Sequence, residues 1–140
     1  MTIRQADLAR ELEVSEMTVH RVLKTLHRNG QPLTELDAIL VFTCAELQAL
    51  ERLNAPTSLR IIGEVADEIR YVAADRKRRC WVVFVENANG SFRLPALSAA
   101  HYEALLCAFP LSLVLPLHQV VSRAVERLDG LQAKLSREAA

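Results

Sequence analysis

The stretch VSEMTVHRVLK, residues 14–24, decides how the N-terminal part of the chain folds. Ser15 is a preferred helix N-cap, because its side-chain oxygen accepts a hydrogen bond from a backbone N–H of the first turn. The apolar residues that follow have the i, i+3, i+4, i+7 spacing of an amphipathic helix: Val19, Val22, Leu23 and Leu26. The opposite face carries His20, Arg21 and Lys24. We therefore predict a capped helix with one face in a core and a basic face toward solvent.

A shorter helix is expected just before this one. Thr2 and Gln5 match the capping-box pattern, and an apolar face follows with Leu8, Ala9 and Leu12. The few residues between the two helices leave room only for a tight turn. Two short helices joined in this way form the helix-turn-helix arrangement, whose second helix enters the major groove of DNA.

This arrangement assigns roles to the outward residues of the second helix, with double-stranded DNA as the expected partner. Glu16, Met17, His20 and Arg21 are expected to read base edges, while the sugar-phosphate backbone is expected to be held by Ser15, Thr18, Lys24 and Arg28. Two of these assignments have open alternatives. Met17 is also suited to packing inward, and Glu16 to stabilising the helix N-terminus through its charge.

The run LARELEVSEMTVHRVLKTL, residues 8–26, resembles the helix-turn-helix of bacterial transcription regulators of the DeoR, lactose-repressor and MerR types. The resemblance rests on Leu-Ala, then Val-Ser, then Thr-Val at the offsets that recur in those families. It implies a DNA-reading role and names no effector. The turn usually carries glycine where this chain has Glu13, so a left-handed backbone there would be strained.

Residues 31–42 predict a wing, and the residues after them a third helix. Pro32 interrupts a helix, and the run that follows is apolar and partly β-branched, which favours a short β excursion. Thr43 with Glu46 is a second capping box, which predicts a helix that closes the core. Residues 1–55 are therefore predicted to form a winged helix-turn-helix domain.

Residues 56–140 are predicted to form an α+β domain for self-association, with ligand or protein sensing as a further role left open. The expected elements are a helix over 59–73, a hairpin of strands at 80–86 and 91–94, a helix capped by Ser98, a strand at 111–115 and a last helix from about Pro116.

The last helix carries an apolar stripe at alternating spacings of four and three residues. The stripe consists of Leu117, Val121, Ala124, Leu128, Leu131 and Leu135. This heptad spacing is typical of a dimerisation helix. A helix that lies on its own domain produces the same pattern, and the sequence leaves both readings open. Dimerisation is also favoured because small recognition helices work in pairs on two-fold DNA sites.

Charge is balanced over the chain but unevenly placed. There are 17 basic and 17 acidic residues, so the formal net charge is zero. Zero charge argues against bulk, nonspecific coating of nucleic acid, but not against a local basic face. The run RKRR, residues 76–79, is interpreted as a solvated loop, with phosphate contact as the alternative.

Several other classes of protein are disfavoured by what the sequence lacks. The cysteines and histidines have no metal-ligand spacing, so no metal and no cofactor are expected, and Cys44, Cys80 and Cys107 are expected to be small core hydrophobes. No glycine-rich phosphate loop or hydrolase signature is present, so catalysis is not expected. The absence of a membrane-length apolar run and of a signal peptide predicts a cytoplasmic protein without a membrane partner.

The sequence thus predicts an α+β, mostly helical protein, with an N-terminal winged helix-turn-helix followed by a small α+β domain that has a β-hairpin and a C-terminal helix. The expected function is sequence-specific DNA binding in transcription regulation, carried out by a homodimer. Two alternatives stay open. One is a phage or plasmid protein of DNA packaging, partition or excision, similar to a terminase small subunit. The other is a protein-interaction adaptor whose helix-turn-helix no longer binds DNA.

Overall fold

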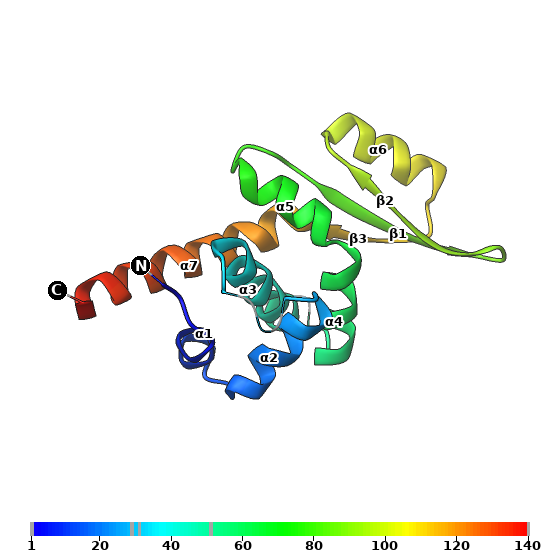
Figure 1. Ribbon diagram of the computed structural model, residues 1–140. Helices are drawn as coiled ribbons and strands as arrows, with labels where there is room; N and C mark the ends of the chain where they lie inside the picture. The colour runs from blue at the N-terminus through cyan, green and yellow to red at the C-terminus, as the bar shows by residue number, and fades with distance from the viewer. Residues whose placement is uncertain (1, 29, 31, 51, 140) are drawn as a thin grey trace.

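The computed structural model describes residues 2–28, 30, 32–50 and 52–139. Over these residues the chain is mixed α+β and 64% helical, with seven helices and one three-stranded antiparallel sheet (Figure 1). The predicted class, α+β and mostly helical, is confirmed. The elements follow in the order α1 (Gln5–Leu12), α2 (Glu16–Thr25), α3 (Glu35–Leu50), α4 (Ala55–Glu64), α5 (Ala66–Ala74), β1 (Trp81–Asn87), β2 (Gly90–Ala96), α6 (Ala99–Ala108), β3 (Ser112–Pro116) and α7 (Leu117–Ala139).

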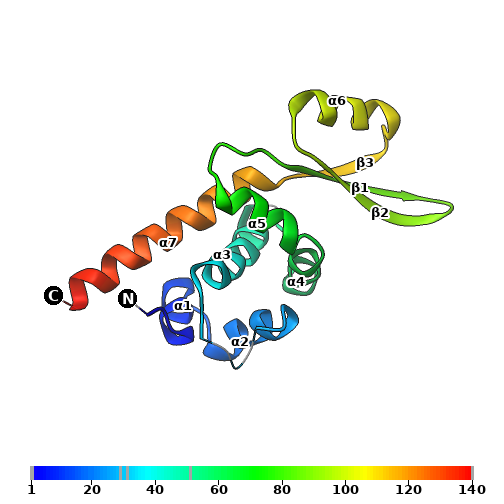
Figure 2. The same ribbon diagram turned by 45° about the horizontal axis from the view of Figure 1, so that its top comes forward.

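Helix α3 is the centre of the fold. Every residue from 38 to 44 is buried, and the side chains of Phe42 and Leu47 have no exposed surface. A helix that is apolar on all sides must be covered on all sides. α3 accordingly contacts α1, α2, α4, α5 and α7, and both ribbon views show it enclosed among them (Figures 1 and 2).

The wing predicted for residues 31–42 is wrong. Residue 31 lies outside the described residues, and the apolar run after it forms the interior of α3 rather than a strand. Among the described residues no strand precedes β1, so the N-terminal part has no wing hairpin. β-propensity depends on surroundings, and here burial on every side outweighs the β-branched content.

A reciprocal cap between Thr34 and Asp37 sets the start of α3. The Thr34 N–H donates to Asp37 Oδ2 at 2.9 Å, and the Asp37 N–H donates to Thr34 Oγ1 at 3.2 Å. Thr43, predicted to cap a later helix, is buried in the middle of α3, and its hydroxyl donates to the Ile39 carbonyl at 2.6 Å. The true cap therefore lies nine residues earlier than the predicted one, which places the whole apolar run inside one helix.

The prediction that the α7 stripe carries a dimer also needs correction. α7 packs along α3 and α5 of the same chain. The stripe residues Leu117, Val121, Ala124, Leu128 and Leu131 are at most 4% exposed, and Leu135 is partly buried against the same core. The alternative reading, a helix that lies on its own chain, describes this packing. Alternating spacings of four and three show that one face is covered, but not whether a second copy covers it.

The region that the sequence assigns to one helix over residues 59–73 contains two. α4 (Ala55–Glu64) begins directly at the predicted domain boundary, and the Asn54 side chain caps it by accepting from the Thr57 N–H at 2.9 Å. Proline suits a first helical turn, where its missing N–H is not needed. Val65, with φ of −109°, separates α4 from α5. Buried residues from both sides of the predicted boundary at 55/56 join in one hydrophobic core.

The sheet has the strand order β2-β1-β3, with β1 antiparallel to both neighbours. The predicted hairpin, third strand and last helix are confirmed, as is the Ser98 cap of α6. On one face of the sheet Val82 and Leu115 join the core. On the other, Trp81 stacks on Tyr102 of α6 with ring centroids 5.0 Å apart.

Two leucines of α3 provide a matched test of its central position. We predict that Leu47→Ala lowers the free energy of unfolding by about 2–5 kcal/mol, because it leaves a cavity where a wholly buried side chain stood. Leu50→Ala, in the same helix but 40% exposed, should cost less than half as much. Urea denaturation of both variants measures this, and equal losses would contradict the burial of α3 described here.

Candidate nucleic-acid interface

Helices α1 and α2 pack as the sequence predicts, through the small and branched residues of their facing sides. Leu8 and Leu23 have no exposed surface, Val19 is 1% exposed, and Ala9 is 4% exposed. A small residue at Ala9 allows α2 to cross close to α1. The apolar face of α2 is therefore fixed in the core, and its opposite face is left at the surface.

The turn between the helices has a left-handed residue where the resembling families carry glycine. Glu13 has φ of 56° and ψ of 42°, a conformation that costs a residue with a Cβ about 1–2 kcal/mol. Hydrogen bonds hold the turn, from the Glu13 N–H to the Arg10 carbonyl at 3.2 Å and from the Val14 N–H to the Ala9 carbonyl at 3.0 Å. The strain expected from the sequence is thus present, and the turn has the backbone that a glycine would favour.

Ser15 is the N-cap of α2, as predicted. Its Oγ accepts from the Thr18 N–H at 3.2 Å and lies 3.1 Å from the Thr18 Oγ1. Both residues are exposed, so the start of α2 presents hydroxyl groups and backbone donors at the surface. Glu16 stands in the first turn, where a negative charge is favourable to the helix dipole.

The outward face of α2 brings together most of the predicted reading residues. Met17 is 57% exposed, which removes the alternative that it packs inward. Arg21 and Lys24 are exposed, and among the described residues neither has an acidic partner. His20 is half-buried beside them. In both ribbon views α2 lies at the lower edge of the molecule, away from the sheet and α6 (Figures 1 and 2).

Arg28, predicted to hold the DNA backbone, is instead engaged by the fold. Its Nε donates to Asp37 Oδ1 at 2.8 Å, and one of its terminal nitrogens donates to Asp37 Oδ2 at 3.0 Å. The same nitrogen lies 3.4 Å from the Pro32 carbonyl. This two-pronged pair ties the segment after α2 to the start of α3, so we remove Arg28 from the reading surface.

Asp37 is the residue that makes this pair strong. Its side chain is 3% exposed, and burial raises the pKa of its carboxyl. The Arg28 guanidinium and the Thr34 N–H and hydroxyl outweigh burial and hold the pKa below its ordinary value of 3.8. Asp37 therefore remains a carboxylate at neutral pH and needs its partner.

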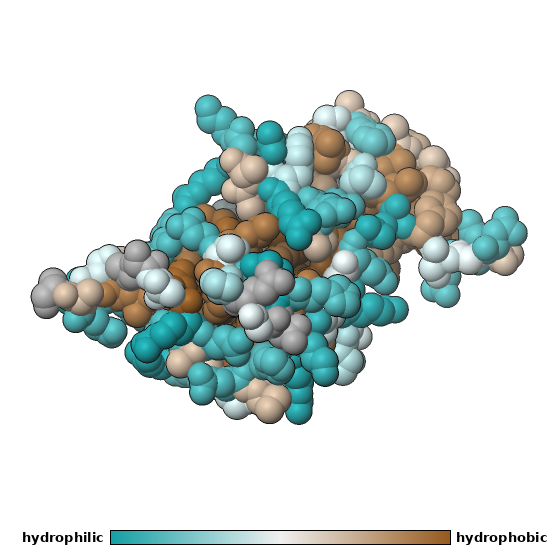
Figure 3. Space-filling model, in the orientation of Figure 1, coloured by the Kyte–Doolittle hydropathy of each residue, from teal (hydrophilic) through white to brown (hydrophobic). Residues whose placement is uncertain are grey.

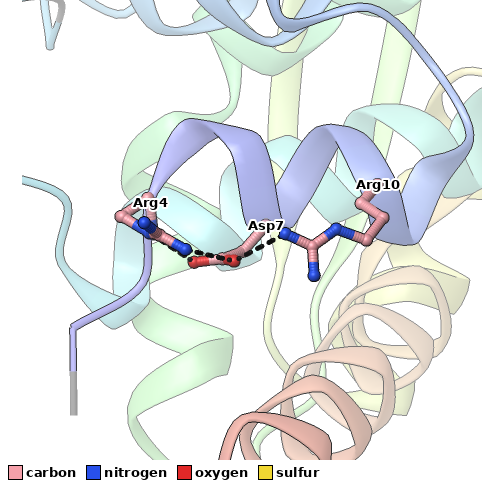
Figure 4. A network of polar contacts seen from close by, with 3 residues as sticks. All are labelled: Arg4, Asp7 and Arg10. Carbon is pink, nitrogen blue, oxygen red and sulfur yellow. Dashed lines mark hydrogen bonds and ion pairs between the residues drawn. The ribbon is translucent and has the colours of Figure 1, made fainter. Parts of the chain in front are cut away.

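A second buried carboxylate, Asp7, organises α1 (Figure 4). It accepts from the Arg4 backbone N–H at 2.9 Å, and the Arg4 and Arg10 side chains approach it from either side. Burial raises the pKa of Asp7, but these donors and charges hold it below the ordinary value. Arg4 is the N-cap, so the predicted Thr2 cap is wrong.

The sequence-based prediction assigned no role to Asp7 or Asp37. For Asp37, however, the sequence does carry a signal. Thr34-Glu35-Leu36-Asp37 has the spacing of a capping box with aspartate in the place of glutamate. Reading it would have placed the start of α3 correctly. The ion pair from Arg28 across nine positions has no local signature of this kind.

Two of the three cysteines are buried. Cys44 and Cys80 are buried, as predicted, and burial together with the charge of Glu68 raises the pKa of Cys80 to about 11. Cys107 is exposed, which corrects the expectation that it belongs to a core.

In the described ranges no three His, Cys, Asp or Glu side chains gather as a metal site would require. No helix within those ranges is long and apolar enough to cross a membrane.

Comparison with known proteins adds no assignment. No protein-family model matches the chain, and no curated protein matches it significantly in sequence. The case for an interface on α2 therefore rests on the geometry above.

The Arg28–Asp37 pair has a pH dependence with a defined sign. Arg28→Met should lower the free energy of unfolding by about 1–3 kcal/mol at pH 7, because it leaves a buried carboxylate without its charged donor. Asp37 has a depressed pKa in the folded state, so its contribution is present above pH 3.8 and disappears as the pH falls through the folded value. The deficit of the variant should therefore shrink at pH 3, as measured by urea denaturation.

Lys24→Met is the matched control, because it removes one positive charge from an exposed position near the same end of α2. It should leave stability within about 0.5 kcal/mol of the original protein. A loss as large as that of Arg28→Met, or a deficit that does not change with pH, would contradict the role given to the pair.

Proposed function

We propose that this protein binds double-stranded DNA sequence-specifically through α2 and acts in transcription regulation. The observation that carries the proposal is the outward face of α2, where Met17, Arg21 and Lys24 are exposed on a helix whose other face is locked in the core. A rigid helix with an exposed, basic and unpartnered face suits insertion into a major groove.

Each residue has a chemical role in this proposal. Arg21 forms the forked hydrogen bonds that recognise guanine, and Met17 supplies an apolar contact of the kind that distinguishes the thymine methyl group. Lys24 pairs with a phosphate, and the capped N-terminus with Ser15 and Thr18 offers donors to another. Glu16 reads cytosine or stabilises the helix start, and His20 sits at the edge of the contact.

The corrected fold changes how DNA is held. Without a wing hairpin before β1 in the described part of the chain, minor-groove contact by a wing is not part of the proposal. Arg28 is also withdrawn, because Asp37 engages it. Reading therefore depends on α2 and its N-terminus alone, which buries little surface and makes two copies on a two-fold site necessary for affinity.

The dimer that this requires has an available surface at the edge strand β3. Leu111 is 91% exposed and Leu113 is 78% exposed, and no charged residue occurs from position 104 to 122. Figure 3 shows hydrophobic residues gathered over α6 and the adjoining sheet. An unpaired, uncharged edge strand is a template for pairing with another chain. Two β3 strands that pair antiparallel would join two copies with the closed symmetry of most dimers.

Arg21 is the residue that tests the DNA proposal. On the site selected from a random DNA pool, Arg21→Ala should cost about 1–3 kcal/mol of binding free energy, and much less on random DNA. Lys24→Ala, the control on the same face, should weaken binding to both by similar factors, because phosphate contacts carry no sequence information. Fluorescence anisotropy on both duplexes measures this.

The alternatives have distinct outcomes in the same experiment. A pool that yields no enriched sequence while the protein remains folded would contradict sequence-specific binding and favour a protein-interaction adaptor. A ring-sized assembly by analytical ultracentrifugation would favour a DNA-packaging protein over a regulator.

The edge strand is tested by placing a charge in it. We predict a dimer for the original protein and a monomer for Leu113→Glu by analytical ultracentrifugation, because a buried carboxylate at the pairing edge is strongly unfavourable. Met17→Glu, an equivalent change at an exposed apolar residue of α2, should stay dimeric. A Leu113→Glu variant that remains a dimer would move the interface away from β3.

A further inference from the structure

The run RKRR, which the proposed reading of DNA by α2 leaves unused, forms one wall of an open groove on the exposed side of α7. The groove has a volume of about 810 Å³. Residues 76–79 line one side, and α7 lines the other with His118, Gln119, Ser122, Arg123 and Glu126. Five of these lining residues are arginine or lysine and one is acidic, so the groove is strongly positive.

The fold holds this segment in place. Arg76 forms an ion pair with Asp129 of α7. Arg78 donates from Nη1 to the Tyr71 carbonyl at 3.0 Å, and its guanidinium lies 4.4 Å from the centre of the Tyr71 ring. The run is therefore a largely exposed loop, as the sequence predicts, in which the fold holds two of the four side chains, those of Arg76 and Arg78.

The remaining cations of the groove are open to a ligand. Lys77, Arg79 and Arg123 are exposed, and among the described residues none of their side chains has a hydrogen-bond or acidic partner. Arginine and lysine left unpaired around a concave surface favour a ligand with several negative charges.

The groove does not share a face with α2. In both ribbon views the segment between α5 and β1 lies on the opposite side of the molecule from α2, with α3 and α7 between them (Figures 1 and 2). A straight stretch of DNA bound to α2 could not reach the groove. A polyanion in the groove must therefore be a different segment from the one that α2 binds.

We propose that this groove is a second binding surface, which holds the phosphate backbone of a duplex DNA stretch other than the one read by α2. A backbone ligand fits because the groove is open and its free cations sit on long side chains of two different elements. Small ligands are instead held in enclosed, largely apolar pockets with a few convergent polar groups. The choice of DNA among phosphate polyanions rests on the proposed function of α2, whereas the phosphate site rests on the groove itself.

The test removes two unpartnered cations from opposite walls of the groove. Full-length Arg79→Ala/Arg123→Ala should bind a random-sequence duplex at least severalfold more weakly in low salt. The slope of log K against log salt should fall by roughly 0.9 for each phosphate that the variant no longer neutralises. Arg70→Ala/Arg137→Ala removes the same charge from exposed positions outside the groove, and should change neither quantity comparably. Equal effects of the two double variants would overturn the proposal.

A capture assay identifies the source of the second stretch. The selected duplex is immobilised, and a labelled random duplex is added in solution. If the original protein retains the label and the groove variant does not, the proposal is supported, and the groove holds a second DNA molecule. In the other supporting outcome, the original protein binds long duplexes more tightly than short ones. If the groove variant loses this difference and the control variant keeps it, the groove holds flanking DNA of the same molecule, which also supports the proposal. A groove variant that loses binding of inorganic triphosphate but retains all DNA binding would overturn it.

These outcomes are separable from those for α2. Arg21→Ala should lower the preference for the selected sequence while it preserves the effect of the groove substitutions. If Arg21→Ala leaves sequence preference intact, the reading by α2 fails, and the groove result still stands or falls on its own salt dependence.

Discussion

Burial of the central part of α3, residues 37–44, is the constraint on which the rest of the structure depends. A 16-residue helix with buried side chains on every face cannot be covered by one neighbour, so several helices must surround it. α7 covers one side along its apolar stripe, α4 and α5 cover others, and the pair of α1 and α2 closes the remainder. α2 packs its apolar face into the core around α3, and its opposite, basic face is left exposed as a result.

Two buried carboxylates hold the starts of α1 and α3 in place. Asp37 sits at the start of α3 and holds Arg28, which follows α2, while Asp7 is held between two arginines within the first turns of α1. Buried charges are tolerated when they are paired and hydrogen-bonded, and removal of one partner is what makes them costly. The Arg28–Asp37 pair ties the segment after α2 to the start of α3, whereas the contacts of Asp7 lie within α1 and its N-cap.

The sequence predicts the parts whose signals are local. The capped, amphipathic α2, the hairpin with its turn residues, and the Ser98 cap all have signatures within a few positions, and the structure contains each of them. The prediction for α3 is wrong because a short apolar run is compatible with either a strand or a buried helix, and its Thr34–Asp37 cap was overlooked. The α7 stripe identifies a covered face, but periodicity does not say whether the cover belongs to the same chain. The groove beside residues 76–79 depends on residues far apart in the chain and has no sequence signal.

Zero net charge is compatible with two basic surfaces because of where the acids lie. Residues 31–74 hold seven acidic and three basic residues. Three of these acids are held by arginines: Asp37 by Arg28, Glu46 by Arg127 and Glu68 by Arg93, and the side chains of Glu46 and Glu68 are only 12% and 15% exposed. Glu11 is similarly engaged by Lys134 of α7. Acidic groups bound to the fold in this way contribute little to the outer potential, whereas unpartnered cations at the surface contribute fully. The unpartnered cations on α2 and around the groove therefore give each surface a local attraction for phosphate, while the zero net charge of the whole chain gives no long-range attraction to nucleic acid.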